Sequence, residues 1–156
     1  MGRVLSADGF VRAARRVQAA GGTVVFTNGV FDLLHYGHAA YLQKARRLGD
    51  ALFVAVNSDR SVRRLKGPSR PLVPLSDRMR LLAALACVDF VTSFTEDTPE
   101  RIIGRVQPDV LVKGADYRVS QIVGADNVKS RGGRVVRLPL AKGRSTSLLL
   151  AKIRRS

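Results

Sequence analysis

The sequence predicts an α/β fold, an open parallel sheet of five strands with helices on both faces. Short apolar segments alternate with helical patterns along the chain, which is typical of strand-helix-strand units. No internal repeat, low-complexity tract or linker interrupts this alternation. At 156 residues the chain is long enough to bury about two thirds of the surface that it exposes when unfolded. We therefore expect one domain covering residues 1–156.

The predicted strands are short and apolar, as expected for strands buried on both faces. They cover residues 23–27, 51–56, 89–94, 109–113 and 134–138. The predicted helices cover residues 38–48, 75–86 and 98–106, followed by a short, poorly defined segment at 119–131 and a last helix from about Ser145.

Local signals mark where these helices begin and end. Ser6 is expected to cap a first helix whose apolar side includes Phe10, Val17 and Ala20, so that residues 1–22 pack on the domain as a helix. Ser76 and Thr98 are expected as N-caps, Pro99 as a first helical residue and Gly49 as a helix end.

The charge of the chain is strongly basic. Its 27 Lys and Arg exceed its 12 Asp and Glu, which gives a formal net charge of +15. Such a charge favours anionic partners, either small phosphorylated substrates or nucleic acid. No helix-turn-helix, zinc-finger or aromatic RNA-binding signature is present, so we expect no specific nucleic acid and keep a basic nucleic-acid-binding module as the remote alternative.

Cysteine content and hydropathy favour a cytoplasmic protein. Cys87 is the only cysteine and follows an apolar helical pattern, so we expect a small core residue and a reducing compartment. No apolar run approaches the roughly 20 residues of a membrane span. We therefore expect no membrane partner.

Unusual polar residues follow four of the five predicted strands. In open parallel sheets, ligands bind beyond the carboxyl ends of the strands, where the strand order reverses. The segments at that edge are residues 28–38, 57–71, 113–117 and 142–147. Neither the dinucleotide fingerprint nor the P-loop pattern is among them, which disfavours a nicotinamide enzyme or an ordinary NTPase.

The two histidines of the chain, His35 and His38, lie three residues apart near a predicted helix start. At that spacing they point the same way, where backbone N–H groups and the helix dipole attract anions. Gly37 lets a phosphate approach the backbone, and Asn28 and Gly29 form the tight exit from the strand. Zinc would need a third ligand and usually the H-E-x-x-H spacing, so we expect a phosphate site and no metal site.

On these residues the chain resembles the nucleotidyltransferases marked by H-x-G-H, here His35-Tyr36-Gly37-His38 after "NGVFDLL". From Val24 onward, "LGDALFVAVNSDRSVRRLKGPSRP", "VDFVTSFTEDTPERII", "PDVLVKGADY" and "GRSTS" are similar in turn to the D-glycero-D-manno-heptose 1-phosphate adenylyltransferases. The resemblance implies a single Rossmann-like nucleotidyltransferase domain. It also implies a stand-alone enzyme, because the sugar kinase fused to many relatives has no room in 156 residues, and a homo-oligomer, dimeric or larger.

The implied reaction transfers AMP from ATP, bound with Mg²⁺, to heptose 1-phosphate. It yields ADP-heptose for the lipopolysaccharide inner core and pyrophosphate. A sugar phosphate has its second pKa near 6, so the attacking oxygen is already largely anionic at neutral pH. The enzyme must therefore supply charge stabilisation and in-line positioning rather than a covalent nucleophile.

The resemblance also assigns roles to individual residues. The expected catalytic residues are His35, His38, Lys66 and Arg78. The expected nucleotide-binding residues are Asn28, Gly29, Val30, Phe31, Lys113, Gly114, Asp116, Gly143, Ser145 and Thr146. The expected sugar-phosphate residues are Asn57, Asp59 and Arg70.

Four positions remain open at this point. Asp32 is either an orienting residue behind the site or a local turn residue. Arg144 and Ser147 depart from the G-x-S-T-T pattern, and Arg144 could add a phosphate contact. Ala115 stands where glycine or aspartate is usual, so a ribose contact there is in doubt. The main alternative activity is that of a cytidylyltransferase acting on a polyol or amino-alcohol phosphate such as glycerol 3-phosphate. Only the segment 57–71 distinguishes the two activities in this sequence.

Overall fold

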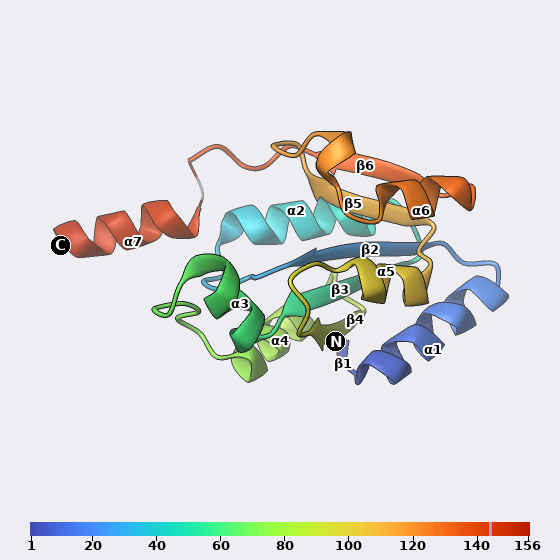
Figure 1. Cartoon of the computed structure of the whole chain (residues 1–156), viewed down its shortest axis with the longest axis horizontal. Helices are drawn as coiled ribbons and strands as arrows, with labels where there is room; N and C mark the ends of the chain where they lie inside the picture. Colours follow the sequence, from blue (N-terminus) through green and yellow to red (C-terminus); the bar gives the residue numbers. More distant parts are fainter. Residues whose placement is uncertain (144) are drawn as a thin grey trace.

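The computed structural model describes residues 1–143 and 145–156, so the expected phosphate contact of Arg144 lies outside the described residues. Its centre is a parallel sheet in the order β1-β4-β3-β2-β5-β6 (Figure 1). The strands are β1 (Arg3–Val4), β2 (Val24–Gly29), β3 (Ala51–Asn57), β4 (Phe90–Phe94), β5 (Val110–Gly114) and β6 (Arg134–Leu138). The predicted α/β class and parallel sheet are confirmed.

The sheet has six strands rather than the predicted five. The additional strand, β1, is a two-residue edge strand, and both of its side chains are exposed. Backbone bonds from Arg3 N to Asp89 O and from Leu5 N to Val91 O, each 2.9 Å, attach this segment beside β4. A two-residue exposed segment has neither the length nor the hydropathy pattern by which a strand is predicted.

Helices cover both faces of the sheet. They are α1 (Ala7–Ala19), α2 (Tyr36–Arg46), α3 (Asp59–Lys66), α4 (Leu75–Ala84), α5 (Glu100–Val106), α6 (Ala125–Ser130) and α7 (Thr146–Arg155), with a 3-10 turn at Val119–Gln121. Apolar residues of α1, α5 and α6 pack on one face, and those of α2 and α4 pack on the other. Figure 1 shows α7 projecting away from this layered body at the carboxyl edge of the sheet.

Some of the predicted helix boundaries are wrong. Ser76 and Thr98 do not act as N-caps, because α4 begins after Pro74 and α5 after Pro99. Pro99 is therefore the N-cap of α5 and not its first helical residue. The helix α2 ends at Arg46, before Gly49. The whole of α3 was missed, although Ser58 caps it by accepting a hydrogen bond from Ser61 N at 3.2 Å.

The predicted cap Ser6 is confirmed, and Ser145, where the last helix was expected to begin, is also a cap. Ser6 accepts from Gly9 N at 3.2 Å and Ser145 accepts from Leu148 N at 3.1 Å. In α1 the buried residues are Phe10 and Ala14, whereas Ala20 lies exposed at the C-cap and not on the packed side.

The strand order places the functional edge at the carboxyl ends of β2 and β5. From β2 the chain proceeds outward through β3 to β4, and it then returns to the other side of β2 to form β5 and β6. The order therefore reverses between β2 and β5, where ligands bind in sheets of this kind.

In the part of the chain that the structure describes, no helix is long and apolar enough to cross a membrane.

Candidate active site

A cleft opens at the carboxyl ends of β2, β3 and β5 and consists of two adjoining hollows of about 390 and 350 Å³. The residues that line both hollows come from β2 and the turn after it, α2, α3, β5 and the start of α7. They are Asn28, Gly29, Val30, Phe31, His38, Lys66, Lys113, Tyr117 and Thr146. The cleft therefore forms at the edge that the sequence predicted.

Each hollow also has walls of its own. The first hollow is closed by Asp32, Asn57, Leu65 and Arg70, by residues 97–99 and by residues 121–123. The second is closed by His35, Gly37, Tyr41, Gly114 and Asp116 and by Leu140, Ala141, Ser145 and Ser147. Asn57 and Arg70, predicted for a sugar phosphate, thus line the first hollow only, and Gly114, Asp116 and Ser145, predicted for a nucleotide, line the second only. The predicted nucleotide residues 28–31 line both hollows.

The turn after β2 has a strained backbone. Phe31 has φ +49°, a left-handed conformation that a bulky residue rarely adopts. Its buried ring lies 5.5 Å from the ring of His38, and a side chain at Gly29 would meet that same Phe31 ring. In the described structure the side-chain oxygen of Asn28 is buried without a hydrogen-bond partner. This turn therefore brings backbone groups and one free acceptor to the seam between the hollows.

The two histidines face each other at the start of α2. Their rings stack with centroids 3.9 Å apart, and His38 Nδ1 accepts a hydrogen bond from the backbone N–H of His35 at 3.4 Å. Because a nitrogen that accepts carries no proton, neutral His38 holds its proton on Nε2. Burial, with further contributions from His35 and Lys66, lowers the pKa of His38 to about 4. His38 is therefore a neutral hydrogen-bond donor at physiological pH.

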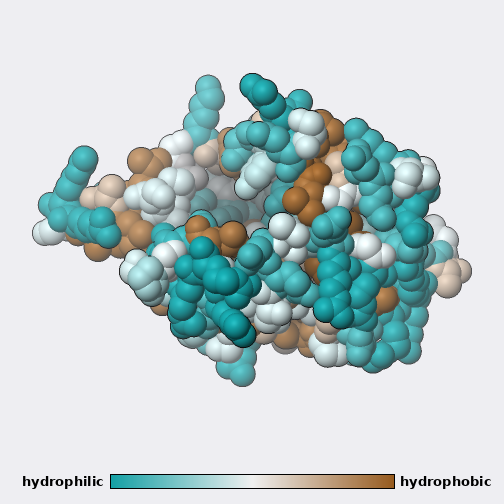
Figure 2. All heavy atoms as spheres, viewed as in Figure 1, coloured by the Kyte–Doolittle hydropathy of each residue, from teal (hydrophilic) through white to brown (hydrophobic). Residues whose placement is uncertain are grey.

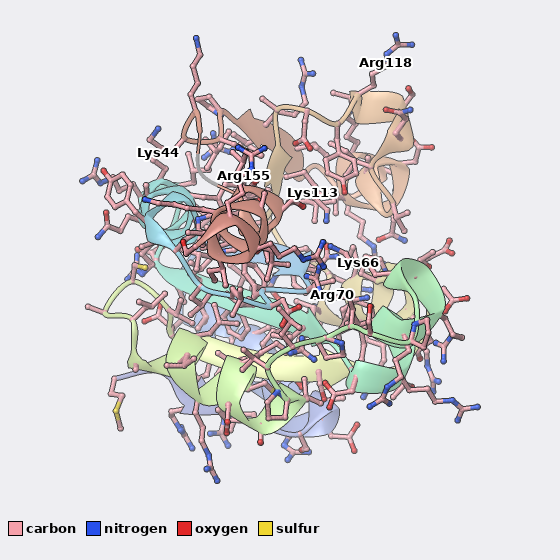
Figure 3. The ribbon with its side chains drawn as sticks, turned by 90° about the vertical axis from the view of Figure 1, so that its left-hand side faces the viewer. Lys44, Lys66, Arg70, Lys113, Arg118 and Arg155 are labelled. Carbon is pink, nitrogen blue, oxygen red and sulfur yellow. The ribbon has the colours of Figure 1, made fainter. Side chains whose placement is uncertain are left out.

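Three cationic side chains converge on the cleft. Figure 3 shows Lys66, Arg70 and Lys113 near one another at this edge, with Arg118 extending away from them. Lys113 Nζ donates to Asn28 O at 3.3 Å and lies 5.3 Å from the centre of the Tyr117 ring. Burial lowers the pKa of Lys113 to about 8, against the opposing effect of Asp116. Fixed cations around a cleft of this size suit a phosphorylated ligand.

Asp32, in the wall of the first hollow, is an orienting residue rather than a turn residue alone. Its carboxylate accepts from Arg70 Nε at 2.7 Å and from the backbone N–H groups of Leu72 and Val73 at 2.9 Å each. Burial works to raise the pKa of Asp32, but these hydrogen bonds outweigh it and lower the pKa. The carboxylate thereby fixes the segment after α3 and the direction of Arg70.

Arg78 and Asp59 do not line either hollow. Arg78 is fully buried and donates to the carbonyls of Val73, Val30 and Asn57 at 2.6 to 2.9 Å. Its remaining Nη donates to Asp59 at 2.7 Å. Every nitrogen of the guanidinium is thus bonded within the protein, so in this arrangement Arg78 and Asp59 hold the cleft segments together from behind.

The start of α7 closes the second hollow. Ser145 caps the helix, and Thr146 Oγ1 donates to Leu33 O at 3.4 Å, which ties α7 to the turn after β2. Gly143, with φ +68°, precedes this cap and lies outside the walls of both hollows. At the end of β5, a side chain at Gly114 would meet the Asp116 carboxylate, which would have to turn away.

Sequence reasoning gave no site role to several wall residues, among them Asp97, Thr98, Tyr117 and Gln121. Asp97 and Thr98 belong to the quoted "FTEDTP" motif, but a motif does not reveal which of its members face a cleft. Tyr117 and Gln121 come from residues 115–121, which carry little periodicity. Cys87 is half-buried against the α2 and α4 side of the core.

The described residues contain no group of three or more His, Cys, Asp or Glu that could hold a metal ion. What the cleft offers is neutral donors and fixed cations at the switch point of a parallel sheet. Such a site suits transfer of a nucleotidyl group between phosphates, where positioning and charge stabilisation carry the chemistry. The class of protein that this fold and site define is the nucleotidyltransferases.

Comparison with known proteins gives the particular family. The chain belongs to the cytidylyltransferase-like family, whose model matches residues 26–138. This confirms the family predicted from the H-x-G-H motif.

Similar curated proteins share one description. "Bifunctional protein HldE" of Syntrophotalea carbinolica is 58% identical over 133 residues, which are 85% of this chain and 27% of that protein. The protein of the same description from Halorhodospira halophila is 56% identical over 151 residues, which are 97% of this chain and 32% of that protein. The chain therefore spans under a third of the length of these relatives.

A solved structure is also similar. The lipopolysaccharide core biosynthesis protein from Thermoplasma volcanium GSS1 matches with a TM-score of 0.67 at 29% identity, covering 78% of this chain and 100% of that one. This match agrees with the nucleotidyltransferase-like α/β fold.

Proposed function

We propose that the protein transfers AMP from ATP to D-glycero-D-manno-heptose 1-phosphate, releasing pyrophosphate and forming ADP-heptose for lipopolysaccharide inner-core synthesis. The observation that carries the proposal is the pair of hollows that meet at His38, Lys66 and Lys113. Two phosphorylated substrates, one in each hollow, would bring their phosphates together at this seam. Identity of more than half to HldE proteins, over nearly the whole chain, supports the choice of substrates.

The nucleotide would occupy the second hollow, against Gly114, Asp116 and the start of α7. Backbone groups of residues 28–31 would contact its phosphates. The sugar phosphate would occupy the first hollow, with its phosphate on Lys66 and Arg70 and with Asn57 beside it. Mg²⁺ would enter with ATP as part of the substrate, held by phosphate oxygens and water, because hard cations of this kind bind phosphate groups readily.

The attacking phosphate oxygen needs no base, since it is already anionic. As it approaches the α-phosphorus, negative charge builds on the equatorial oxygens. His38 Nε2–H, kept neutral and pointed by its Nδ1 contact, would donate to that charge, and Lys66 would balance it. His35 would donate alongside it to the α- and β-phosphates. Arg78 and Asp59 would act by positioning the segments that carry Val30 and Asn57.

The test is pyrophosphate release by the purified protein with Mg²⁺ across a matrix of ATP, CTP, GTP and UTP against heptose 1-phosphate and glycerol 3-phosphate. We expect the highest kcat/KM for ATP with heptose 1-phosphate. A faster reaction of CTP with glycerol 3-phosphate would replace the proposal by a polyol-phosphate cytidylyltransferase. Salt-resistant binding of duplex DNA without any nucleotide turnover would replace it by a nucleic-acid-binding role.

We also propose that the enzyme works in the cytoplasm, where ATP is available, and as a homo-oligomer. Leu148, Leu149 and Ile153 of α7 are exposed, and none of the residues of this helix is buried. Figure 2 shows apolar surface on this projecting helix next to a largely hydrophilic body. A ten-residue helix is marginal in water without packing partners, which favours its burial against another copy. Sedimentation equilibrium would give a mass of two or more chains, and a mass of one chain would contradict this proposal.

A further inference from the structure

The first hollow has one wall that does not fit a phosphate. Besides the cations Lys66 and Arg70, it is lined by Asp97 and Thr98, from the connection between β4 and α5, and by Gln121, from the 3-10 turn. A carboxylate repels an anionic group placed against it, but it can accept hydrogen bonds from neutral hydroxyl groups. The chemistry of this wall therefore differs from that of the phosphate side.

Arg64 holds Asp97 in a fixed position. From α3 its Nε donates to Asp97 Oδ1 at 2.6 Å, and its Nη2 donates to the carbonyl of Thr95. Within the described residues the second carboxylate oxygen, Oδ2, has no partner. The ion pair thus leaves one strong acceptor available, on a side chain that is 60% exposed at the cleft.

Gln121 complements Asp97 with a donor. Its Oε1 accepts from the backbone N–H of Arg118 at 3.1 Å, which fixes the orientation of the amide. Its Nε2 has no partner in the part of the chain that is described. Thr98 is exposed beside Asp97, and its hydroxyl, which can donate and accept, has no partner among the described residues either.

We infer that Asp97, Thr98 and Gln121 form a hydroxyl-binding wall that selects the sugar part of the acceptor substrate. An acceptor, a donor and a hydroxyl on one wall match a polyhydroxylated ring, in which each hydroxyl both donates and accepts. Arg64 is a positioning residue that acts through Asp97. This inference rests on the proposed function for the identity of the acceptor, but its chemistry applies to any sugar or polyol phosphate.

The central experiment compares Asp97→Asn with wild type. Asparagine keeps the shape of the side chain and an oxygen for Arg64, but it turns the free acceptor into a donor. We expect the KM for the sugar phosphate to rise roughly tenfold, as for the loss of one hydrogen bond to a charged group that is partly exposed. The kcat and the KM for ATP should stay within about twofold of wild type. Asp8→Asn is the matched control, because Asp8 is also an exposed partner of an arginine, Arg105, but lies on α1.

A second arm separates the hydroxyls from the phosphate. Ethyl phosphate, which lacks hydroxyls, serves as a competitive inhibitor against the sugar phosphate. Its Ki should be the same for wild type and Asp97→Asn, since only the phosphate contacts remain. Gln121→Leu, on a separate segment, should also raise the KM for the sugar phosphate. Arg64→Leu should raise that KM when Asp97 is present, but should not raise it further in the Asp97→Asn variant.

The outcomes are distinct from those that test the proposed function. Wild-type turnover of heptose 1-phosphate tests that function, and if another sugar or polyol phosphate is the better substrate, the variants are compared on that one. The hydroxyl-binding wall is overturned if the acceptor KM stays within twofold in both Asp97→Asn and Gln121→Leu. It is also overturned if the ethyl phosphate Ki rises as much as the KM, or if Asp97→Asn changes the ATP KM and Mg²⁺ dependence instead.

Discussion

His38 Nδ1 accepts the backbone N–H of His35 at 3.4 Å, so one histidine fixes the tautomer of the other. The bond leaves the proton on Nε2 of His38, a residue that lines both hollows. Spacing alone placed both imidazoles on one side of a helix start. The structure adds that the pair is stacked and that His38 is neutral, which makes it a donor and not a cation.

Replacing His38 with Ala should lower kcat by roughly 10² to 10³, the loss typical of one deleted donor to a transition-state charge. The KM for ATP should change much less, because the interaction strengthens only as charge develops. Kinetics and thermal melts of both proteins check this. If kcat falls by less than about fivefold while the two melting curves coincide, His38 has a structural role only.

The acid sensitivity of folding should also depend on His38. Its pKa is about 4 in the folded protein against 6.5 for an unperturbed histidine, so the unfolded chain binds the proton more tightly. The free energy of unfolding should therefore fall as the pH is lowered from about 6.5 toward 4. His38→Gln cannot titrate and should lose less stability over that range. Urea titrations of both proteins at pH 7.5 and 5 give the difference, and equal losses would contradict the lowered pKa.

Lys113 should make nucleotide capture sensitive to alkaline pH. Its pKa of about 8 means that the folded protein loses this charge as the pH rises through 8, well below the ordinary lysine value of 10.5. Since kcat/KM reports ionisations of the free enzyme, kcat/KM for ATP should decline above about pH 8 in wild type. In Lys113→Met, kcat/KM for ATP should be low at every pH and should not decline above pH 8. Lys129→Met, an exposed control on α6, should show the pH profile of wild type. An unchanged profile in Lys113→Met would remove Lys113 from the nucleotide site.

The sequence predicted the parts of the fold that carry a repeating physical signal. Buried strands such as residues 51–56 are continuous apolar runs, and serine caps such as Ser6 and Ser145 precede helices with suitable spacing. The helix α3 was missed because its mean hydropathy is low and four of its eight residues are Lys or Arg, which looks like a solvated loop. The edge strand β1 was missed because two residues hold no pattern.

The site was predictable where backbone geometry and motif coincide, as at residues 28–38. The site was less predictable where a charged side chain could bind either the substrate or another group of the protein. Arg64 belongs to the basic run that sequence reasoning set beside the phosphates, yet it bonds Asp97. Arg70 is both a wall of the cleft and a partner of Asp32. Such choices depend on which acceptors the fold brings near, and no local pattern records them.

For Arg78 the sequence prediction and the structure differ most. The sequence predicted a catalytic role, whereas the structure buries the side chain completely. Its guanidinium donates to three carbonyls and to Asp59, so it joins the turn after β2, the end of β3 and the start of α4. Lysine keeps the charge but cannot match this planar set of donors.

We therefore expect Arg78→Lys to unfold more easily, by about 3 kcal/mol, since a buried charge would be left with unpaired partners. For a chain of this size that corresponds to a fall in Tm of roughly 6 to 12 °C. Arg80→Lys, an exposed change on the same helix, should leave the Tm within about a degree or two. At a temperature where both variants are folded, Arg78→Lys should also raise the KM for both substrates, because the segments it joins border both hollows. If its Tm equals that of Arg80→Lys while kcat falls a hundredfold, Arg78 reaches the substrate in the working enzyme and belongs to the catalytic residues after all.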